Sequence, residues 1–321
     1  MWLLLSLIAG GIIGAVVVRA MMPVSAALFE ACGSLVPSKF CSIITSDAVF
    51  YYSFATFGLL PLALFLEHLL PAREQQPMLS VGLLHDACWA VAYPLLKISL
   101  YTGFGSLLAS VYSSHLAFLK TDFLAGYPLP AQVFFVVVAA DFLAWFHHLV
   151  RHKVAFLWEF HKVHHSTTQL NYFTDQRVHP VDVLAAQAIQ FVPFYSLSLD
   201  TAVPTFVAWQ LFTGWHTRFY HANIRTNLGP FRHLLVTPQS HRIHHSADPA
   251  HRDRNFGVIF SVWDWIFGTR HNAVDDYPAT GIQDERFPLE KELKLRSFLL
   301  TPIRQLCYPI LSITHRLGRR A

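Results

Sequence analysis

The stretch DFLAWFHHLVRHKVAFLWEFHKVHH, residues 141–165, decides the fold of this chain. Six of its 25 residues are histidine. Five of these fall at helical metal-ligand spacings, three or four residues apart: His148, His152, His161, His164 and His165. On a helix, such neighbours project from one face with Cβ atoms about 5 to 6 Å apart. One metal ion can bridge that distance, so the stretch predicts metal-binding helices.

A second box, QSHRIHHS at residues 239–246, repeats the later spacing with His241, His244 and His245. The chain has 19 histidines, and a purely structural use of histidine seldom concentrates it in tight clusters. Neutral imidazole suits iron, zinc, copper and nickel, and the clustered histidines exceed what one tetrahedral zinc ion binds. We therefore expect two metal ions.

The composition is that of a membrane protein. The chain is 53% hydrophobic, 14% aromatic and 14% charged, whereas soluble domains average about 25% charged residues. Its net charge of +4 fits basic loops on the cytoplasmic side of a membrane. Because no Lys/Arg run stands on an otherwise polar surface, nucleic acid is not an expected partner.

Long apolar runs predict membrane spans at residues 2–18, 48–66, 87–119 and 131–145. We expect residues 2–18 to be an uncleaved first span, because a basic start and a cleavage site are not convincing there. The run at 87–119 is either one long span or two half-helices that meet near Gly103 and Gly105.

The basic residues around the histidine boxes indicate a cytoplasmic location by the positive-inside bias. Residues 181–214 are largely apolar with histidines beyond both ends, so we expect a membrane hairpin with its tip near Asp200. Each arm of roughly 16 residues would reach about 24 Å. Residues 256–267 and 297–314 are predicted to be interfacial or packing segments rather than spans.

The predicted fold is therefore all-α: a polytopic membrane protein with about four to six membrane helices and a cytoplasmic, histidine-rich helical cap. We expect a membrane-spanning region at residues 1–125, a catalytic region at 126–275 and a cytoplasmic or interfacial tail at 276–321. The membrane is either a bacterial inner membrane or the endoplasmic reticulum. Cys32 and Cys41 lie in a predicted external loop, either as a disulfide or as two free thiols.

Asp141 lies seven residues before His148, within about 20° on the same helix face. A carboxylate at this position can accept the free ring N–H of a metal-bound histidine and fix its tautomer. Acidic residues within membrane helices are functional by default. The alternative is a polar residue that faces a water-filled gap. We expect Asp141 to be a partner of a ligand, not a ligand itself.

The boxes and their neighbouring sequences resemble the fatty acid hydroxylase / sterol desaturase superfamily. The matching stretches are LWEFHKVHHS (157–166), NYFTDQRVHP (171–180), HANIRTNLGP (221–230), TPQSHRIHHS (237–246) and WDWIFGT (263–269). The resemblance covers about residues 131–270, and the order and spacing of the boxes make it specific. Members of that superfamily are integral membrane di-iron enzymes that use O2 and electrons to hydroxylate or desaturate lipids.

The resemblance implies nine metal ligands: His148, His152, His161, His164, His165, His221, His241, His244 and His245. His179 also matches a family motif, with coordination, substrate contact and helix-start packing all open. His216 precedes Thr217, which stands where some members have a histidine, and it could substitute only if the helix turn is distorted. Asn255 and Asp264 are expected to hold the histidine helices by hydrogen bonds, with plain loop structure as the alternative.

The implied function is a membrane-bound di-iron monooxygenase that hydroxylates or desaturates a sterol, fatty acyl, ether lipid or other isoprenoid chain. The sequence contains no GxGxxG fingerprint, no CxxCH haem site and no iron–sulfur cysteine pattern. Electrons are therefore expected from a separate ferredoxin or b-type cytochrome with its reductase. The alternatives are a membrane zinc hydrolase, although HExxH is absent, and a metal-binding or transport protein.

Overall fold

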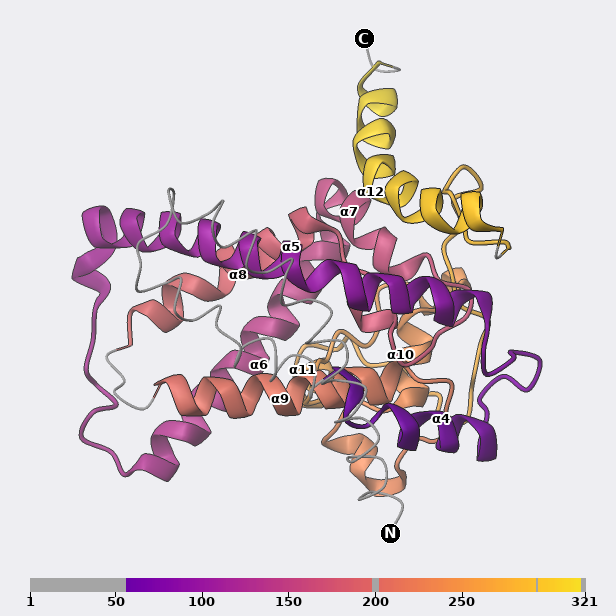
Figure 1. Cartoon of the computed structure of the whole chain (residues 1–321). Coiled ribbons are helices and arrows are strands. Elements are labelled where there is room, and N and C mark those ends of the chain that lie inside the picture. The colour runs from indigo at the N-terminus through magenta and orange to yellow at the C-terminus, as the bar shows by residue number, and fades with distance from the viewer. Residues whose placement is uncertain (1–55, 198–201, 293, 319–321) are drawn as a thin grey trace. The chain divides into compact units, whose positions relative to one another are not determined.

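A computed structural model describes residues 56–197, 202–292 and 294–318, and its regular elements there are helices without a β-strand (Figure 1). The predicted all-α class is confirmed for this part of the chain. The first predicted span, Cys32 and Cys41 lie outside the described residues.

The chain divides into two compact units, each assembled from segments that are distant in sequence. We call the described parts of residues 1–62, 92–143 and 183–215 the apolar unit, and the described parts of residues 63–91, 144–182 and 216–321 the histidine unit. The boundaries predicted at residues 125 and 275 separate continuous regions of the sequence, whereas each compact unit combines several separate segments. These boundaries stay a prediction.

One uninterrupted helix, α5 (Val81–Val111), passes through Gly103 and Gly105. This result removes the alternative of two half-helices that meet there. A π-helical turn, Tyr112–Leu116, and a 3-10 turn, Ala117–Leu119, follow it. Within the apolar unit, the Tyr112 hydroxyl lies 3.0 Å from the hydroxyl of Ser196, at the end of α8 (Pro180–Tyr195).

The helices α8 and α9 (Ala202–His221) occupy the segment for which the sequence predicts a hairpin. They are separated by residues 196–201, where the predicted tip lies. Asp200 itself is not among the described residues. The segment is thus two helices, and its insertion into a membrane stays a prediction.

Helix α6 (Leu129–Lys153) is long and apolar enough to cross a membrane, and no other helix in the described part meets that criterion. Shorter apolar helices are α4 (Leu60–Leu69) and the first part of α5. Several large side chains in the first half of α6 are exposed, including Leu129 and Phe134. The expected total of four to six spans stays a prediction.

The histidine unit contains the short helices α7 (Ala155–His165), α10 (Pro238–His244) and α11 (Val262–Ile266). The same unit contains three 3-10 turns: Thr174–Gln176, Gly229–His233 and Pro249–His251. Helix α10 begins with Pro238 after a capping box, in which Thr237 and Ser240 satisfy each other's backbone N–H groups. Val163 and Ile243 are fully buried between the histidines of their helices.

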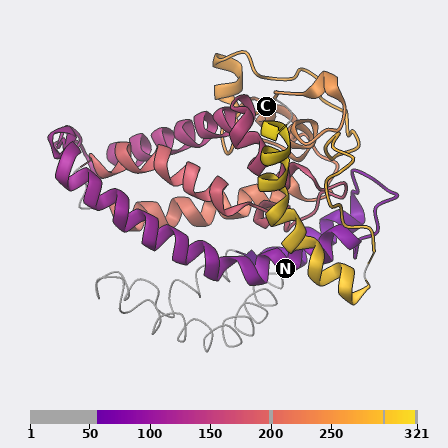
Figure 2. The same cartoon turned by 90° about the horizontal axis from the view of Figure 1, so that it is seen from above.

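The two segments predicted as interfacial or packing elements have different structures. Residues 256–267 form a loop and α11, with Phe256 buried and Trp265 exposed. Residues 297–314 lie within the longer helix α12 (Leu295–Gly318), which contains Pro302 and Pro309. Helix α12, in yellow, lies beside α7 in both views (Figures 1 and 2).

Candidate metal centre

Nine histidines of the histidine unit form two groups. The first group consists of His148, His152, His161, His165 and His244. The second group consists of His164, His221, His241 and His245. Within each group, one ring nitrogen per histidine lies within 4.8 Å of all the others. These are the nine residues to which the sequence resemblance assigns ligand roles.

Each HxxHH box divides between the two groups. On α7, His161 and His165 belong to the first group, while His164 belongs to the second. On α10 the division is reversed, because His244 belongs to the first group. Histidines four residues apart therefore share a group, whereas the remaining histidine of each box joins the other. A box thus contributes to two neighbouring sites rather than to one ion.

A break at Val154 makes the first group possible. Helix α6 ends at Lys153, Val154 is extended with φ −91° and ψ 107°, and α7 begins at Ala155. On a continuous helix, residues nine apart such as His152 and His161 would point about 180° apart. The change of direction instead brings their ring centroids to 5.0 Å.

The inward nitrogens have the spacing expected around an ion. The Nε2–Nε2 distances are 3.1 Å for His152–His165, 2.9 Å for His221–His241, 3.1 Å for His241–His245 and 3.3 Å for His164–His221. Two nitrogens bound at about 2.1 Å and at right angles would be about 3.0 Å apart. The groups therefore fit two metal ions.

The outward nitrogens bind acceptors that fix the rings. Five Nδ1 atoms have an oxygen partner: His148 (Phe256 O, 2.9 Å), His161 (Asp182 Oδ2, 2.9 Å), His164 (Arg177 O, 3.3 Å), His221 (Thr217 O, 2.7 Å) and His244 (Arg254 O, 2.8 Å). For three of these rings the opposite Nε2 is buried without a hydrogen-bond partner in the described part: His148, His161 and His244. Such a division of the two nitrogens is typical of metal-bound histidine.

The grouped histidines outside the predicted span are neutral near pH 7. Burial, reinforced by neighbouring charges, lowers the pKa well below 6.5 for His161, His164, His165, His241, His244 and His245. Burial lowers the pKa of His221 to about 3. A neutral imidazole keeps a free lone pair, which metal binding requires.

Asp182 is a site residue that the sequence analysis missed. Its carboxylate is buried and accepts hydrogen bonds at 2.9 Å from both His161 Nδ1 and Arg151. It lies in the first turn of α8, three residues after His179. The sequence signal was an acidic residue at a helix start beside a family motif, although its partner lies 21 residues earlier.

The loop around Asn255 supplies two of the carbonyl acceptors. Asp253 and Asn255 have left-handed backbone conformations, with φ of 60° and 57°, which Asp and Asn adopt more readily than other non-glycine residues. In this loop conformation, the Arg254 carbonyl lies at His244 Nδ1 and the Phe256 carbonyl lies at His148 Nδ1. The Asn255 side chain also donates to the Ser240 carbonyl on α10 at 2.9 Å.

Asp264 holds the same loop from the other side. Its buried carboxylate accepts four hydrogen bonds: from Phe256 N and Gly257 N at 2.8 Å, Trp145 Nε1 at 3.0 Å and Thr269 Oγ1 at 2.6 Å. Gly257 is closely packed, because a Cβ there would lie 2.8 Å from Val236 Cγ2. Asp264 thereby links α6 to the loop whose carbonyl binds His148.

Three other predicted residues lie outside the two groups. His179 donates from Nε2 to the Leu306 carbonyl at 3.0 Å, and its Nδ1 accepts from Val181 N at the start of α8. This arrangement favours helix-start packing. The backbone of Val236 is a hydrogen-bond partner of His216. Asp141 is fully buried in α6. The Nδ1 acceptor of His148 is the carbonyl of Phe256 rather than Asp141. The role of Asp141 as the partner of a metal ligand stays a prediction.

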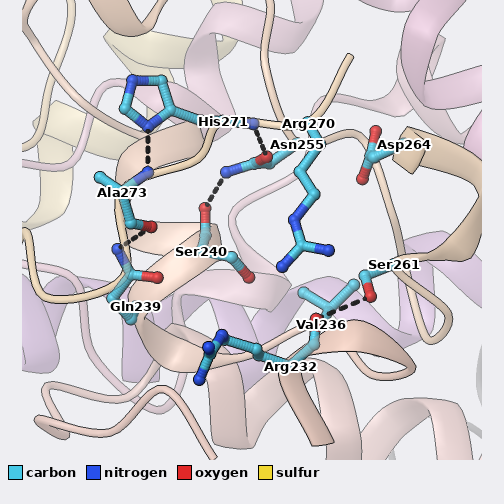
Figure 3. Close-up of a pocket in the computed structure, with 10 residues that line it drawn as sticks. All are labelled: Arg232, Val236, Gln239, Ser240, Asn255, Ser261, Asp264, Arg270, His271 and Ala273. Atoms are coloured by element: carbon cyan, nitrogen blue, oxygen red, sulfur yellow. Dashed lines mark hydrogen bonds between the residues drawn. The ribbon is translucent and has the colours of Figure 1, made fainter. Parts of the chain in front are cut away.

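A small cavity lies among the loops of the histidine unit (Figure 3). Its volume is about 20 Å³, and its lining includes Arg232, Arg270, Asn255 and Asp264, so it has room for little more than one water molecule. None of the nine histidines lines it. The cavity therefore belongs to the supporting loops rather than to the metal-binding groups.

Residues 133–269 match the fatty acid hydroxylase family. The chain carries a fatty acid hydroxylase domain. This region contains all nine grouped histidines, together with Asp182 and Asp264. The family assignment made from the histidine boxes is thus confirmed. No solved structure matches the chain significantly.

Curated relatives resemble this domain. Ornithine lipid hydroxylase OlsE from Rhizobium tropici is 30% identical over 171 residues, which cover 53% of this chain and 51% of the relative. Alkylglycerol monooxygenase from Homo sapiens is 31% identical over 126 residues, covering 39% of this chain and 27% of the relative. The Danio rerio alkylglycerol monooxygenase is 31% identical over 125 residues, with the same coverage. The chain thus spans about half the length of the first relative and about a quarter of the others.

Proposed function

We propose that this protein is a membrane-bound, O2-dependent di-iron oxygenase that hydroxylates or desaturates a lipid. The observation that supports it best is the presence of two adjacent all-histidine groups, of five and four residues, within a fatty acid hydroxylase domain. A single tetrahedral zinc site would use four ligands at most. Nine converging imidazoles instead fit two ions with positions left for O2 and solvent.

The nine grouped histidines would hold the metal ions. Bound iron would supply the activation of O2 needed to attack an unactivated C–H bond. The chain itself orients the ligands, because Asp182 and the carbonyls of Phe256 and Arg254 fix three of the rings. Burial keeps the rings neutral and excludes bulk water from the centre.

The proposed substrate is a membrane lipid, and its hydrocarbon chain reaches the centre from the bilayer. The relatives named ornithine lipid hydroxylase and alkylglycerol monooxygenase support an acyl or alkyl chain within a larger lipid. Sterols and other isoprenoid chains belong to the same proposal. Hydroxylation and desaturation both begin with removal of a hydrogen atom from carbon, and product analysis distinguishes them.

The proposed electron donor is a separate ferredoxin or b-type cytochrome with its reductase. Basic side chains of the histidine unit are available to such a partner, including Lys153 and Arg225, each about half exposed. They would steer an acidic carrier toward the cytoplasmic face. We place this face at a bacterial inner membrane or the endoplasmic reticulum.

Metal analysis combined with lipid mass spectrometry tests the proposal. The protein purified from membranes should contain two iron ions per chain. Membranes that contain it should show O2-dependent gain of one oxygen atom or loss of two hydrogen atoms in a lipid class. One zinc ion with lipid hydrolysis and no O2 uptake would refute the proposal. Metal uptake into vesicles without any change in the lipids would favour a transporter instead.

A further inference from the structure

Helix α12 buries several uncharged polar side chains and exposes several large apolar side chains. Its buried polar residues are Thr301, Gln305 and Ser312. Its exposed apolar residues include Leu295, Leu299, Ile303 and Ile310, with exposed fractions of 73, 57, 55 and 58%. At 100° per residue these four lie within about 80° of one another, whereas the three polar residues lie on the other side. We call the four apolar residues the outer stripe.

Polar side chains on the inner face of α12 bind other segments of the histidine unit. Gln305 donates to the Pro288 carbonyl at 3.0 Å and to Glu290 at 3.1 Å. The Tyr308 hydroxyl and the Lys162 ammonium of α7 both bind Asp284 at 2.9 Å. These contacts fix the helix orientation, so the outer stripe cannot turn inward without breaking them.

Further contacts join α12 directly to the metal-binding helix. Arg316 pairs with the buried Glu159 of α7 at 2.7 Å. The Leu306 carbonyl accepts from His179, and Lys162 lies 5.0 Å from the centre of the Tyr308 ring. Helix α7 carries His161, His164 and His165. Helix α12 therefore links whatever covers the outer stripe to the helix that carries three of the grouped histidines.

The charges of α12 indicate what covers the stripe. The helix has no acidic residue, and its exposed cationic or titratable side chains are Arg296, Arg304, His315 and Arg316. The sequence continues with Arg319 and Arg320. A helix with an apolar stripe and basic flanks is suited to the boundary between lipid headgroups and acyl chains, particularly of anionic lipids. Pairing with α12 of a second copy would instead bring like charges together.

We propose that α12 is an interfacial helix that lies in the plane of an anionic membrane surface. The outer stripe enters the acyl boundary, and the basic side chains reach the headgroups. The buried polar inner face and two internal prolines are unsuited to a membrane-crossing helix. The inner face holds α7, so the candidate centre has a fixed position relative to the membrane surface. The proposal does not depend on the reaction that the centre catalyses.

Spin-label accessibility in vesicles tests this placement. The full chain is prepared with Cys32, Cys41, Cys88 and Cys307 replaced by serine, and one cysteine is then introduced as Leu299→Cys, Ile303→Cys or Ile310→Cys. Asp275→Cys serves as the matched exposed control, since the Asp275 side chain is 79% exposed in the same unit. Each labelled protein is placed in phosphatidylcholine vesicles that contain phosphatidylglycerol. Collision rates are measured with O2, which concentrates in lipid, and with a water-soluble nickel chelate.

The stripe labels should collide with O2 several-fold more often, relative to the nickel chelate, than the control label does. Equal ratios at the stripe and the control would overturn the proposal. Exclusion of both reagents, with dipolar broadening between labels on two chains, would show that a second copy covers the stripe. The double variant Arg296→Gln/Arg304→Gln should reduce the immersion depth only when phosphatidylglycerol is present. An unchanged depth would contradict the role of anionic lipid.

Discussion

In three imidazoles of this centre the two ring nitrogens have separate roles. His148, His161 and His244 direct Nδ1 to an oxygen acceptor and leave Nε2 buried without a partner among the described residues. A buried polar atom without a partner is costly in a stable fold. The arrangement is stable when a metal ion binds that atom, so these three rings are the strongest single-residue support for a metal centre.

Alanine substitutions in each group test the ligand roles. His164→Ala removes a ligand from the second group, and His244→Ala removes one from the first. Each variant should lose bound metal, and O2-dependent turnover should fall below detection because the two ions act together. Metal content by mass spectrometry and product formation are measured side by side. His233→Ala, at an exposed position outside both groups, should behave as wild type. Unchanged turnover of either ligand variant would refute its role.

Asp182→Asn tests the partner of His161. The amide has nearly the same size but no negative charge to support the His161 N–H. We expect about 10- to 100-fold weaker metal binding, the usual effect of losing such a partner. Metal affinity is measured by competition with a chelator, using Asp275→Asn at an exposed position as the control. Equal affinities in the variant and the wild type would show that Asp182 does not support the ligand.

At the scale of elements, short interruptions and buried ion pairs position the histidine helices. The extended Val154 turns α7 away from the direction of α6. The Arg177 guanidinium, fully buried, bonds Asp86 on α5 at 2.6 Å and Glu290 at 2.8 Å. Its backbone carbonyl is the acceptor of His164. The same residue thus connects three distant segments with one of the candidate ligands.

Glu290→Gln tests this connection. Burial opposes the charged form of Glu290, but the adjacent Arg177 guanidinium keeps the pKa of the carboxyl below its ordinary value. Loss of one partner from a buried ion pair should cost about 3 kcal/mol in the free energy of unfolding. Denaturant or thermal unfolding of the detergent-solubilised protein measures this change. Glu292→Gln is the matched control, since Glu292 pairs with Lys294 at the surface, and it should unfold like the wild type. Equal unfolding of the Glu290 variant would exclude a stabilising role.

At the scale of the whole molecule, the candidate centre lies within one of the two compact units. All nine grouped histidines, Asp182, Asp264 and α12 belong to the histidine unit. The apolar unit contains the first half of α6, the helix long enough to cross a membrane. The first half of that helix and the candidate centre are thus built from different sets of residues.

The stability of the metal-free protein should fall on acidification. The pKa values of the histidines on α7 and α10 are lowered by burial, so the folded state binds fewer protons than the unfolded chain below about pH 6.5. The contribution of these buried, neutral histidines to the free energy of unfolding is therefore complete above that pH and is lost as the pH falls. The thermal midpoint of chelator-treated protein, measured from pH 8 to pH 5, should decrease below pH 6.5, and the holoprotein should release metal there. A constant midpoint would show that the rings are not buried in the metal-free protein.

The sequence by itself determined the helical class, the family and the nine histidines that the fold gathers. Helical spacing and the imidazole ring are local properties, and they can be recognised without knowing the fold. The division of segment 181–214 into two helices also followed from apolar runs of limited length. The contribution of each box to two groups did not follow, because it depends on how α7 and α10 face each other.

Asn255 and Asp264 were expected from the sequence to hold the histidine helices, but only the tertiary structure identified Asp182 and the carbonyl acceptors of the rings. Asp182 at the start of α8 meets His161 on α7 across a long connecting segment, and Asp264 acts through the backbone of Phe256. The acceptors of His148 and His244 are carbonyl groups, which every residue possesses and which no sequence pattern distinguishes. The role of the polar inner face of α12 can likewise be recognised only from its hydrogen bonds to Asp284 and Glu290. The sequence specifies the chemistry of each side chain, whereas long-range packing determines which partners a buried group has.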